Sequence, residues 1–92
     1  MTARREEIEA AVVAYDAANP LTPLPRNAAR LLVAMFATSD VCQRKLDDIA
    51  ASGFSRRTLP ATLEQLVRAG FLYHQRGLAS DTYWLNLPPV RR

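Results

Sequence analysis

The sequence predicts one mainly α-helical domain, residues 1–92, that ends in a small β-hairpin and so belongs to the α+β class. Apolar residues recur at spacings of three and four along most of residues 2–70, which is typical of amphipathic helices. After Gly70 the spacing changes to two, in segments rich in aromatic and β-branched residues. The chain has 92 residues, of which 49% are apolar, so we expect a single core.

The first helix is expected at residues 2–18. Its apolar stripe comprises Ile8, Val12 and Tyr15, and glutamates occupy its early turns, where the helix dipole favours negative charge. The stripe has to be buried either in the chain's own core or against a second copy of the helix. We favour the second arrangement, a homodimer formed through residues 2–18. The segment "NPLTPLP" (19–25) then predicts a stiff connector, because it contains three prolines.

Two further helices are expected at residues 26–38 and 44–52. Pro25 suits the first turn of the helix at 26–38, and "VCQ" (41–43) between the two helices is a short piece capable of forming a strand. The turn "SGFS" follows at residues 52–55. Gly53 is free there to adopt a positive φ.

The next helix lies within "SRRTLPATLEQLVRAG" (55–70), and Pro60 limits where it can begin. If Ser55 capped the helix, Pro60 would fall at the fifth helical position, where its missing N–H breaks the hydrogen-bond ladder. If the helix begins near Thr58 or Leu59, the proline falls in the first turn, where it is tolerated. We therefore predict a late start, with the two arginines before it in the preceding turn.

The hairpin is predicted from "FLYHQR" (71–76) and "DTYWLNL" (81–87). Tyr73 and Tyr83 are expected to pack it onto the helices. Trp84 points to the other face, where it covers the outer side of the hairpin or anchors a protein partner. The tail "PPVRR" (88–92) is expected to be flexible and basic.

The net charge of +3 is unevenly distributed. Residues 1–25 carry two arginines against four acidic residues, a net of −2, whereas residues 26–92 carry ten Lys or Arg against five acidic residues, a net of +5. A basic body indicates a partner rich in phosphate, and ordinary solubilising charge is the alternative.

Composition argues against several classes of protein. One cysteine, Cys42, and one histidine, His74, give neither a disulfide framework nor a zinc site within one chain. No third group accompanies them, the carboxylates lie beside arginines, and no Gly-rich phosphate loop is present, so we predict no enzyme, metal or cofactor. The sequence has neither a signal-peptide pattern nor a membrane-spanning apolar run, and a cytoplasmic protein is expected.

Residues 26–87 follow the order helix, strand, helix, turn, helix, hairpin, which is that of a helix-turn-helix with a wing. Residues 44–87 resemble the winged helix-turn-helix domain of bacterial regulators of the MarR and GntR kinds. The matching residues are Leu46, Ile49 and Ala50 in one helix, Gly53, Phe54 and Ser55 in the turn, Leu63, Leu66 and Gly70 in the next helix, and Tyr83 and Leu85 in the hairpin. The resemblance implies a winged helix-turn-helix with an extra N-terminal helix.

The expected DNA-reading surface is the outward face of the helix within 55–70. Arg57 suits guanine or phosphate, Gln65 suits adenine, and Ala61 allows close approach to a thymine methyl. The alternative is a solvated face on which Glu64 and Arg68 form an i,i+4 pair. The complete set of candidate DNA contacts is Arg44, Lys45, Arg56, Arg57, Thr58, Ala61, Thr62, Gln65, Arg68, His74 and Arg76.

Four of these candidates lie outside the segment 55–70. Arg44 and Lys45 open the helix expected at 44–52, whose N-terminus favours a phosphate. Arg76 stands at the wing loop, where arginine suits a narrow minor groove, and His74 could touch a phosphate or be structural.

The sequence therefore predicts a sequence-specific double-stranded DNA-binding protein. It would be a small transcriptional regulator or an accessory factor of a mobile element such as a plasmid, a phage or an integrating element. The alternative is a winged-helix protein-interaction module without DNA binding, motivated by Trp84, Tyr15 and the modest net charge.

Overall fold

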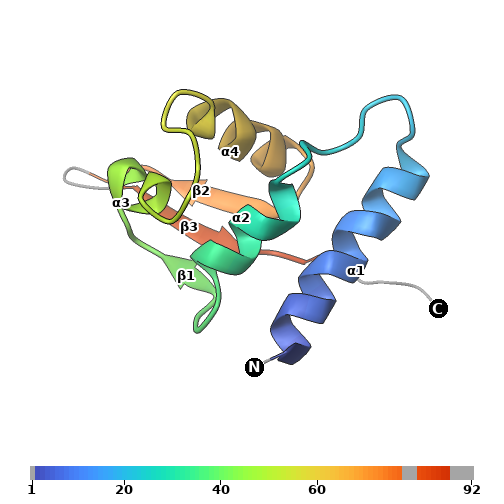
Figure 1. The fold of residues 1–92 in the computed structure, drawn as a ribbon, viewed down its shortest axis with the longest axis horizontal. Coiled ribbons are helices and arrows are strands. Elements are labelled where there is room, and N and C mark those ends of the chain that lie inside the picture. The colour runs from blue at the N-terminus through green and yellow to red at the C-terminus, as the bar shows by residue number, and fades with distance from the viewer. Residues whose placement is uncertain (1, 78–80, 88–92) are drawn as a thin grey trace.

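A computed structural model describes residues 2–77 and 81–87, so the predicted tail at 88–92 lies outside the described residues. Over these ranges the chain forms four helices and a small three-stranded antiparallel sheet, a mixed α/β arrangement (Figure 1). The elements are α1 (Thr2–Ala18), α2 (Ala28–Met35), β1 (Val41–Cys42), α3 (Leu46–Ala50), α4 (Leu59–Arg68), β2 (Leu72–Gln75) and β3 (Thr82–Leu85).

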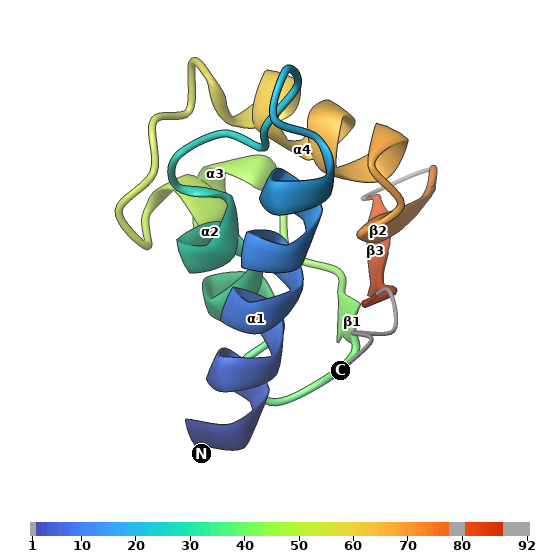
Figure 2. The same ribbon diagram turned by 90° about the vertical axis from the view of Figure 1, so that its right-hand side faces the viewer.

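Helix α1 has the predicted bounds, but its apolar stripe is not a free surface. Ile8 is fully buried and Val12 is buried, since α1 packs along α2 (Figure 2). Tyr15 is half-buried and packs edge-on against Phe71, with 5.6 Å between the ring centroids. The predicted dimerisation surface is therefore wrong, because α2 and Phe71, the residue before β2, cover these side chains within one chain.

The connector after α1 contains no helix or strand, as the three prolines predicted. The Asp16 carboxylate accepts a hydrogen bond from the Leu24 N–H at 2.9 Å and so fixes its course. Helix α2 begins two residues later than predicted. Pro25 lies in a turn before it, where its carbonyl accepts the Ala28 N–H at 3.0 Å, and not in the first helical turn. The helix also ends early, at Met35.

Helix α3 is shorter than predicted and begins after Arg44 and Lys45, with Lys45 in extended conformation at its N-cap. The turn after it contains Gly53 at φ +108°, a value that glycine adopts without strain.

Helix α4 begins at Leu59, so the late start predicted from Pro60 is confirmed. The Leu59 N–H donates to the Ser55 carbonyl at 3.0 Å, and Pro60 stands in the first turn, where no donor is required. At the other end Gly70 adopts φ +86°, and the Phe71 N–H donates to the Leu66 carbonyl at 3.0 Å, which closes the helix.

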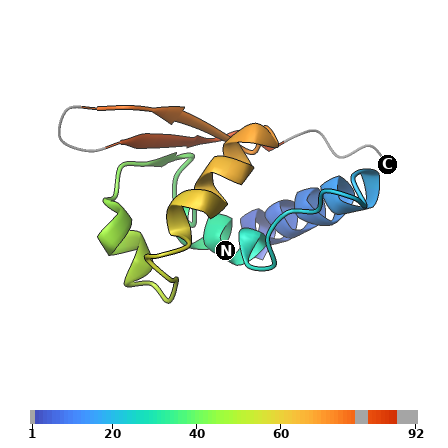
Figure 3. The ribbon, with the colours of Figure 1, turned by 90° about the horizontal axis from the view of Figure 1, so that it is seen from above.

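The sheet has the strand order β1-β3-β2, and the described helices lie on one of its faces (Figure 3). Tyr83, on the inner face, is buried as predicted. Tyr73 pairs with Trp84 across β2 and β3, and because alternate residues face opposite ways both lie on the outer face. The prediction that Tyr73 packs onto the helices is therefore wrong, whereas the outward orientation of Trp84 is confirmed.

One core unites these elements. Its largest fully buried side chains come from the four helices, from the residue after α2 and from the residue before β2: Ile8, Leu31, Leu32, Phe36, Ile49, Leu59, Leu66 and Phe71. Helix α4 is thereby fixed on its inner side, and its outer side is available. Among the described helices, none is long and apolar enough to cross a membrane.

Candidate nucleic-acid interface

The outward face of α4 is polar and exposed. Leu59, Leu63 and Leu66 are buried, whereas Ala61 and Gln65 project from the opposite side. This separation follows from the helical repeat, which places residues three and four apart on one side.

The structure corrects the prediction that Thr62 contacts DNA. The residue is 8% exposed, and its hydroxyl donates to the Thr58 carbonyl at 3.2 Å. Its side chain is thus occupied inside the protein and cannot serve as a phosphate contact.

The turn before α4 contains two arginines, Arg56 and Arg57, which differ in their contacts with acidic side chains. Arg56 Nε contacts the Asp47 carboxylate at 2.8 Å, so its charge is compensated by α3. Arg57 and Thr58 are exposed, and within the described part of the chain Arg57 takes part in no ion pair. Arg57 is therefore an exposed cation at the N-terminal end of α4 whose charge no described acidic side chain compensates.

Arg68 near the end of α4 forms the predicted i,i+4 pair with Glu64, at 2.7 Å. Both side chains are exposed, so the pair adds about 0.3–0.5 kcal/mol to helix stability and can open at little cost. Arg68 remains on the outward face, but with part of its charge compensated.

The residues before α3 do not form the predicted anion site. The Arg44 guanidinium folds back along α3 and donates to the Asp48 carbonyl and the Ser52 hydroxyl, both at 2.9 Å. Asp47 and Asp48 occupy the first turn, where they already complement the positive end of this five-residue helix. Lys45 is exposed and stays available, but it precedes the helix.

His74 is held inside the hairpin and does not face a phosphate. Its ring stacks on Tyr83, with 4.5 Å between the centroids and 9° between the planes. His74 Nε2 lies 3.0 Å from Asp81 Oδ2, and no hydrogen bond of regular geometry forms at this nitrogen. Of the two roles considered for His74, a phosphate contact or a structural side chain, the geometry supports the structural one.

Asp81 connects His74 to the wing loop. Its other oxygen accepts the Gly77 N–H at 3.4 Å, and the contact with His74 is the main cause that lowers the pKa of the Asp81 carboxyl. Tyr83 stacks on the His74 ring. Burial raises the pKa of the Tyr83 phenol, which is therefore neutral at pH 7. The base of the wing is thus fixed by stacking and by one charged carboxylate.

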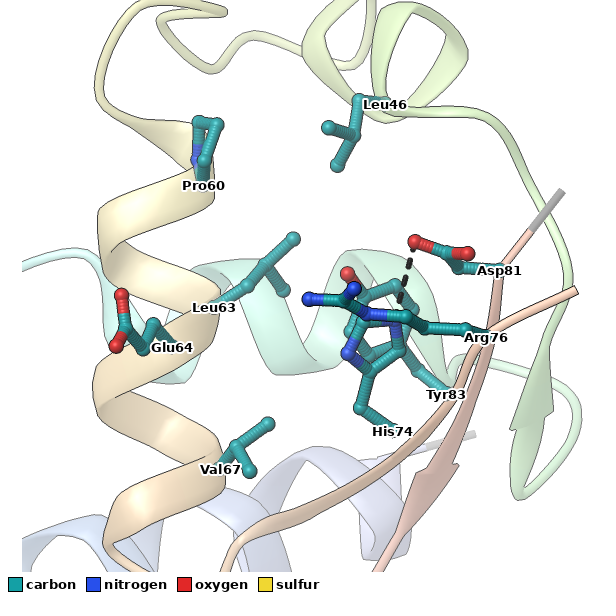
Figure 4. A pocket seen from close by; sticks show the side chains of 9 residues that line it. All are labelled: Leu46, Pro60, Leu63, Glu64, Val67, His74, Arg76, Asp81 and Tyr83. Atoms are coloured by element: carbon teal, nitrogen blue, oxygen red, sulfur yellow. Dashed lines mark ion pairs between the residues drawn. The ribbon is translucent and has the colours of Figure 1, made fainter.

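Arg76 extends from the end of β2 into a cleft of about 410 Å³ between the hairpin, α4 and the start of α3 (Figure 4). Its guanidinium points toward α4, on the side where Glu64 and Leu63 lie. The α4 residues that line this cleft are Pro60, Leu63, Glu64 and Val67. Arg76 therefore adjoins the Glu64 side of α4, whereas Gln65 and Arg68 line a separate cleft with the connector after α1.

Arg30 has a role that the sequence did not indicate. Its guanidinium donates to the Gly53 carbonyl at 2.8 Å and lies 4.8 Å from the centre of the Phe54 ring. It ties the turn between α3 and α4 to α2, and no local spacing in the sequence signals a contact of this range.

Five predicted candidates are exposed at α4 or just before it: Arg57 and Thr58 in the preceding turn, and Ala61, Gln65 and Arg68 on one face of the helix. Arg76 lies across the cleft on the Glu64 side of the helix. Within residues 2–77 and 81–87, no group of three or more His, Cys, Asp or Glu side chains could hold a metal ion. The chain matches no family model, no curated protein and no solved structure.

Proposed function

We propose that this chain binds double-stranded DNA sequence-specifically through a winged helix-turn-helix. In this proposal α3 and α4 are the two helices, α4 enters the major groove, and the β2–β3 hairpin is the wing. The biological role would be that of a small transcriptional regulator or an accessory factor of a mobile element. The observation that carries the proposal is the exposed polar face of α4. Arg57 at its start takes part in no ion pair among the described residues, and Arg76 lies across the cleft on the Glu64 side of the helix.

The chemistry of the α4 face supports this use. An α-helix fits the major groove, where its N-terminal side chains meet base edges. Arg57 reaches guanine or phosphate there, Ala61 leaves room for the backbone to approach, and Gln65 offers both donor and acceptor to adenine. Pro60 stiffens the start of the helix, so Arg57 is presented from a turn of defined shape.

The wing supplies a second, less specific contact. Arg76 sits at the shoulder of the loop, and the Asp81 contacts with His74 and Gly77 hold the base of that loop in place. An arginine beside a loop held in this way suits phosphate or the negative potential of a narrow minor groove.

The interaction-module alternative loses one of its two aromatic motives, since Tyr15 packs against Phe71 inside the chain. Exposed Trp84 remains as its support, and it lies on the outer face of the sheet rather than on α4.

Salt-dependent binding to a pool of random duplexes, followed by fluorescence anisotropy, tests the proposal. Arg57→Ala is compared with Arg5→Ala, which removes the same residue type and charge from α1, where Arg5 pairs with Glu9. We expect wild type and Arg5→Ala to bind alike, and Arg57→Ala to lose about 1–3 kcal/mol against an enriched sequence. If no duplex binds in a salt-dependent manner, or if the two variants behave alike, DNA reading by α4 is wrong.

A further inference from the structure

We propose that protonation of His74 sets whether Arg76, the arginine of the wing, is free to contact DNA, because the two cations share one carboxylate, Asp81. This inference rests on the proposed function, since it concerns the regulation of the wing contact. All three side chains line the cleft between the hairpin and α4 (Figure 4). His74 and Arg76 are two residues apart, and alternate residues of an extended chain face the same way, so both reach the side of the hairpin that carries Asp81.

The structure shows Asp81 in contact with the histidine. His74 Nε2 lies 3.0 Å from Asp81 Oδ2, and the stack of its ring on Tyr83 holds the imidazole in this position (Figure 4). Arg76 is exposed, takes part in no ion pair among the described residues, and points its guanidinium toward α4. This is the arrangement expected for a protonated imidazole, because an ion pair then joins it to the carboxylate and leaves the arginine free.

Loss of the proton from His74 favours the other partner of Asp81. An imidazole ordinarily loses its proton near pH 6.5, whereas an arginine keeps its charge throughout the physiological range. Among the described residues that line the cleft, Arg76 is then the remaining cation. Its charge already acts on the carboxylate, because it adds to the lowering of the Asp81 pKa that His74 chiefly causes. Asp81 should therefore attract Arg76 once the histidine is neutral, which withdraws the arginine from DNA.

The other titratable groups at this cleft leave Asp81 as the shared carboxylate. Glu64 on α4 is already compensated by Arg68, at 2.7 Å. The Tyr83 phenol stays neutral, since burial raises its pKa, and Cys42, its cross-strand neighbour on β1, is buried. Helix α3 contributes an apolar side chain to the cleft. The competition is therefore between His74 and Arg76 for Asp81.

The side chains that exchange partners are accessible to solvent protons. The His74 side chain is 25% exposed and that of Asp81 is 44% exposed, so the pair can open and titrate without unfolding of the hairpin. The exchange predicts one more phosphate contact in acid than in base. The slope of log K against log salt for a duplex should therefore be steeper by about 0.9 when His74 is protonated.

Anisotropy titrations over a series of salt concentrations, at about pH 5.5 and about pH 8, test the exchange on either side of the ordinary imidazole range. We expect the wild type to show the steeper slope in acid. Asp81→Asn should show the steep slope at both pH values, and Arg76→Ala the shallow slope at both. Asp48→Asn is the matched control, because it loses the same charge from an aspartate that is in no ion pair among the described residues, and it should keep the difference.

Two results of these titrations would overturn the proposal. The first is a wild-type slope that is the same at both pH values although duplex binds. The second is a slope of Asp81→Asn that still becomes steeper in acid, because the charge of His74 would then act on DNA without any exchange of partners.

Nuclear magnetic resonance of the free protein separates the exchange from DNA binding. His74 is the single histidine, so its ring signals report one titration. The Cζ signal of Arg76, assigned with Arg76→Ala, should shift with the same midpoint in the wild type and lose this shift in Asp81→Asn. A Cζ signal that ignores the titration of His74 would overturn the exchange. Coupled signals in a protein that binds no duplex would keep the exchange and reject the proposed function, so the two failures are distinguishable.

Discussion

Neutralising Asp47 should strengthen DNA binding, because this residue holds Arg56 away from a ligand. The Arg56–Asp47 contact is 2.8 Å long, with 52% of the arginine side chain and 84% of the aspartate side chain exposed. A pair this exposed contributes at most about 1 kcal/mol to folding, so Asp47→Asn should leave the domain folded. The substitution releases Arg56 next to Arg57 at the start of α4.

The gain can be read in the salt dependence. If the released arginine contacts one more phosphate, the slope of log K against log salt becomes steeper by about 0.9. The assay is anisotropy titration of a labelled duplex over a series of salt concentrations, with thermal unfolding to verify that the variant is folded.

Asp48→Asn is the matched control for Asp47→Asn. Asp48 lies in the same turn of α3 and loses the same charge, but its side chain is in no ion pair among the described residues. We expect the steeper slope for Asp47→Asn alone. An equal increase in slope for both variants would show that the change in net charge strengthens DNA binding and that the release of Arg56 does not. That result would refute the reasoning.

Three further outcomes follow from single contacts. Pro60→Ala should cost about 0.4–1 kcal/mol through the unfolded chain, measured by denaturant unfolding, and a stabilisation would contradict its first-turn placement. Thr62→Val should cost about 1 kcal/mol of stability and leave the affinity for duplex unchanged, whereas a loss of affinity would return Thr62 to the interface. Because the pKa of Asp81 is lowered in the folded state, its carboxylate stabilises the fold above the ordinary value near 3.9 and ceases to do so as pH falls through the lowered one. Asp81→Asn should therefore flatten the acid side of the pH–stability curve, and an unchanged curve would contradict the role of its contact with His74.

Periodicity and proline chemistry predicted the elements well where they act locally. The start of α4 follows from Pro60, and the two hairpin strands follow from alternation after Gly70. The ends of α2 and α3 could not be predicted as well from the sequence, because they depend on which carbonyl accepts each terminal N–H. The turn that places Pro25 before α2 is an example.

The candidate site was predicted only in part, because long-range partners decide which charges are free. Arg57 and Gln65 are exposed as their positions on the helix require. Arg56, in the turn before α4, is compensated by Asp47, nine residues earlier on α3, and no spacing rule anticipates that pair. The stripe on α1 likewise shows only that it must be buried, and tertiary packing determines what buries it.

Selection of bound duplexes from a random pool, carried out in parallel for the wild-type chain and Gln65→Ala, is the most direct measurement of DNA reading by α4. We predict that the wild type enriches a defined motif and that Gln65→Ala enriches the same motif with one position relaxed. A motif that repeats as two inverted half-sites would also show that two copies bind one duplex. A pool that remains random after selection, or an identical motif from both proteins, would contradict recognition of bases by this face of α4.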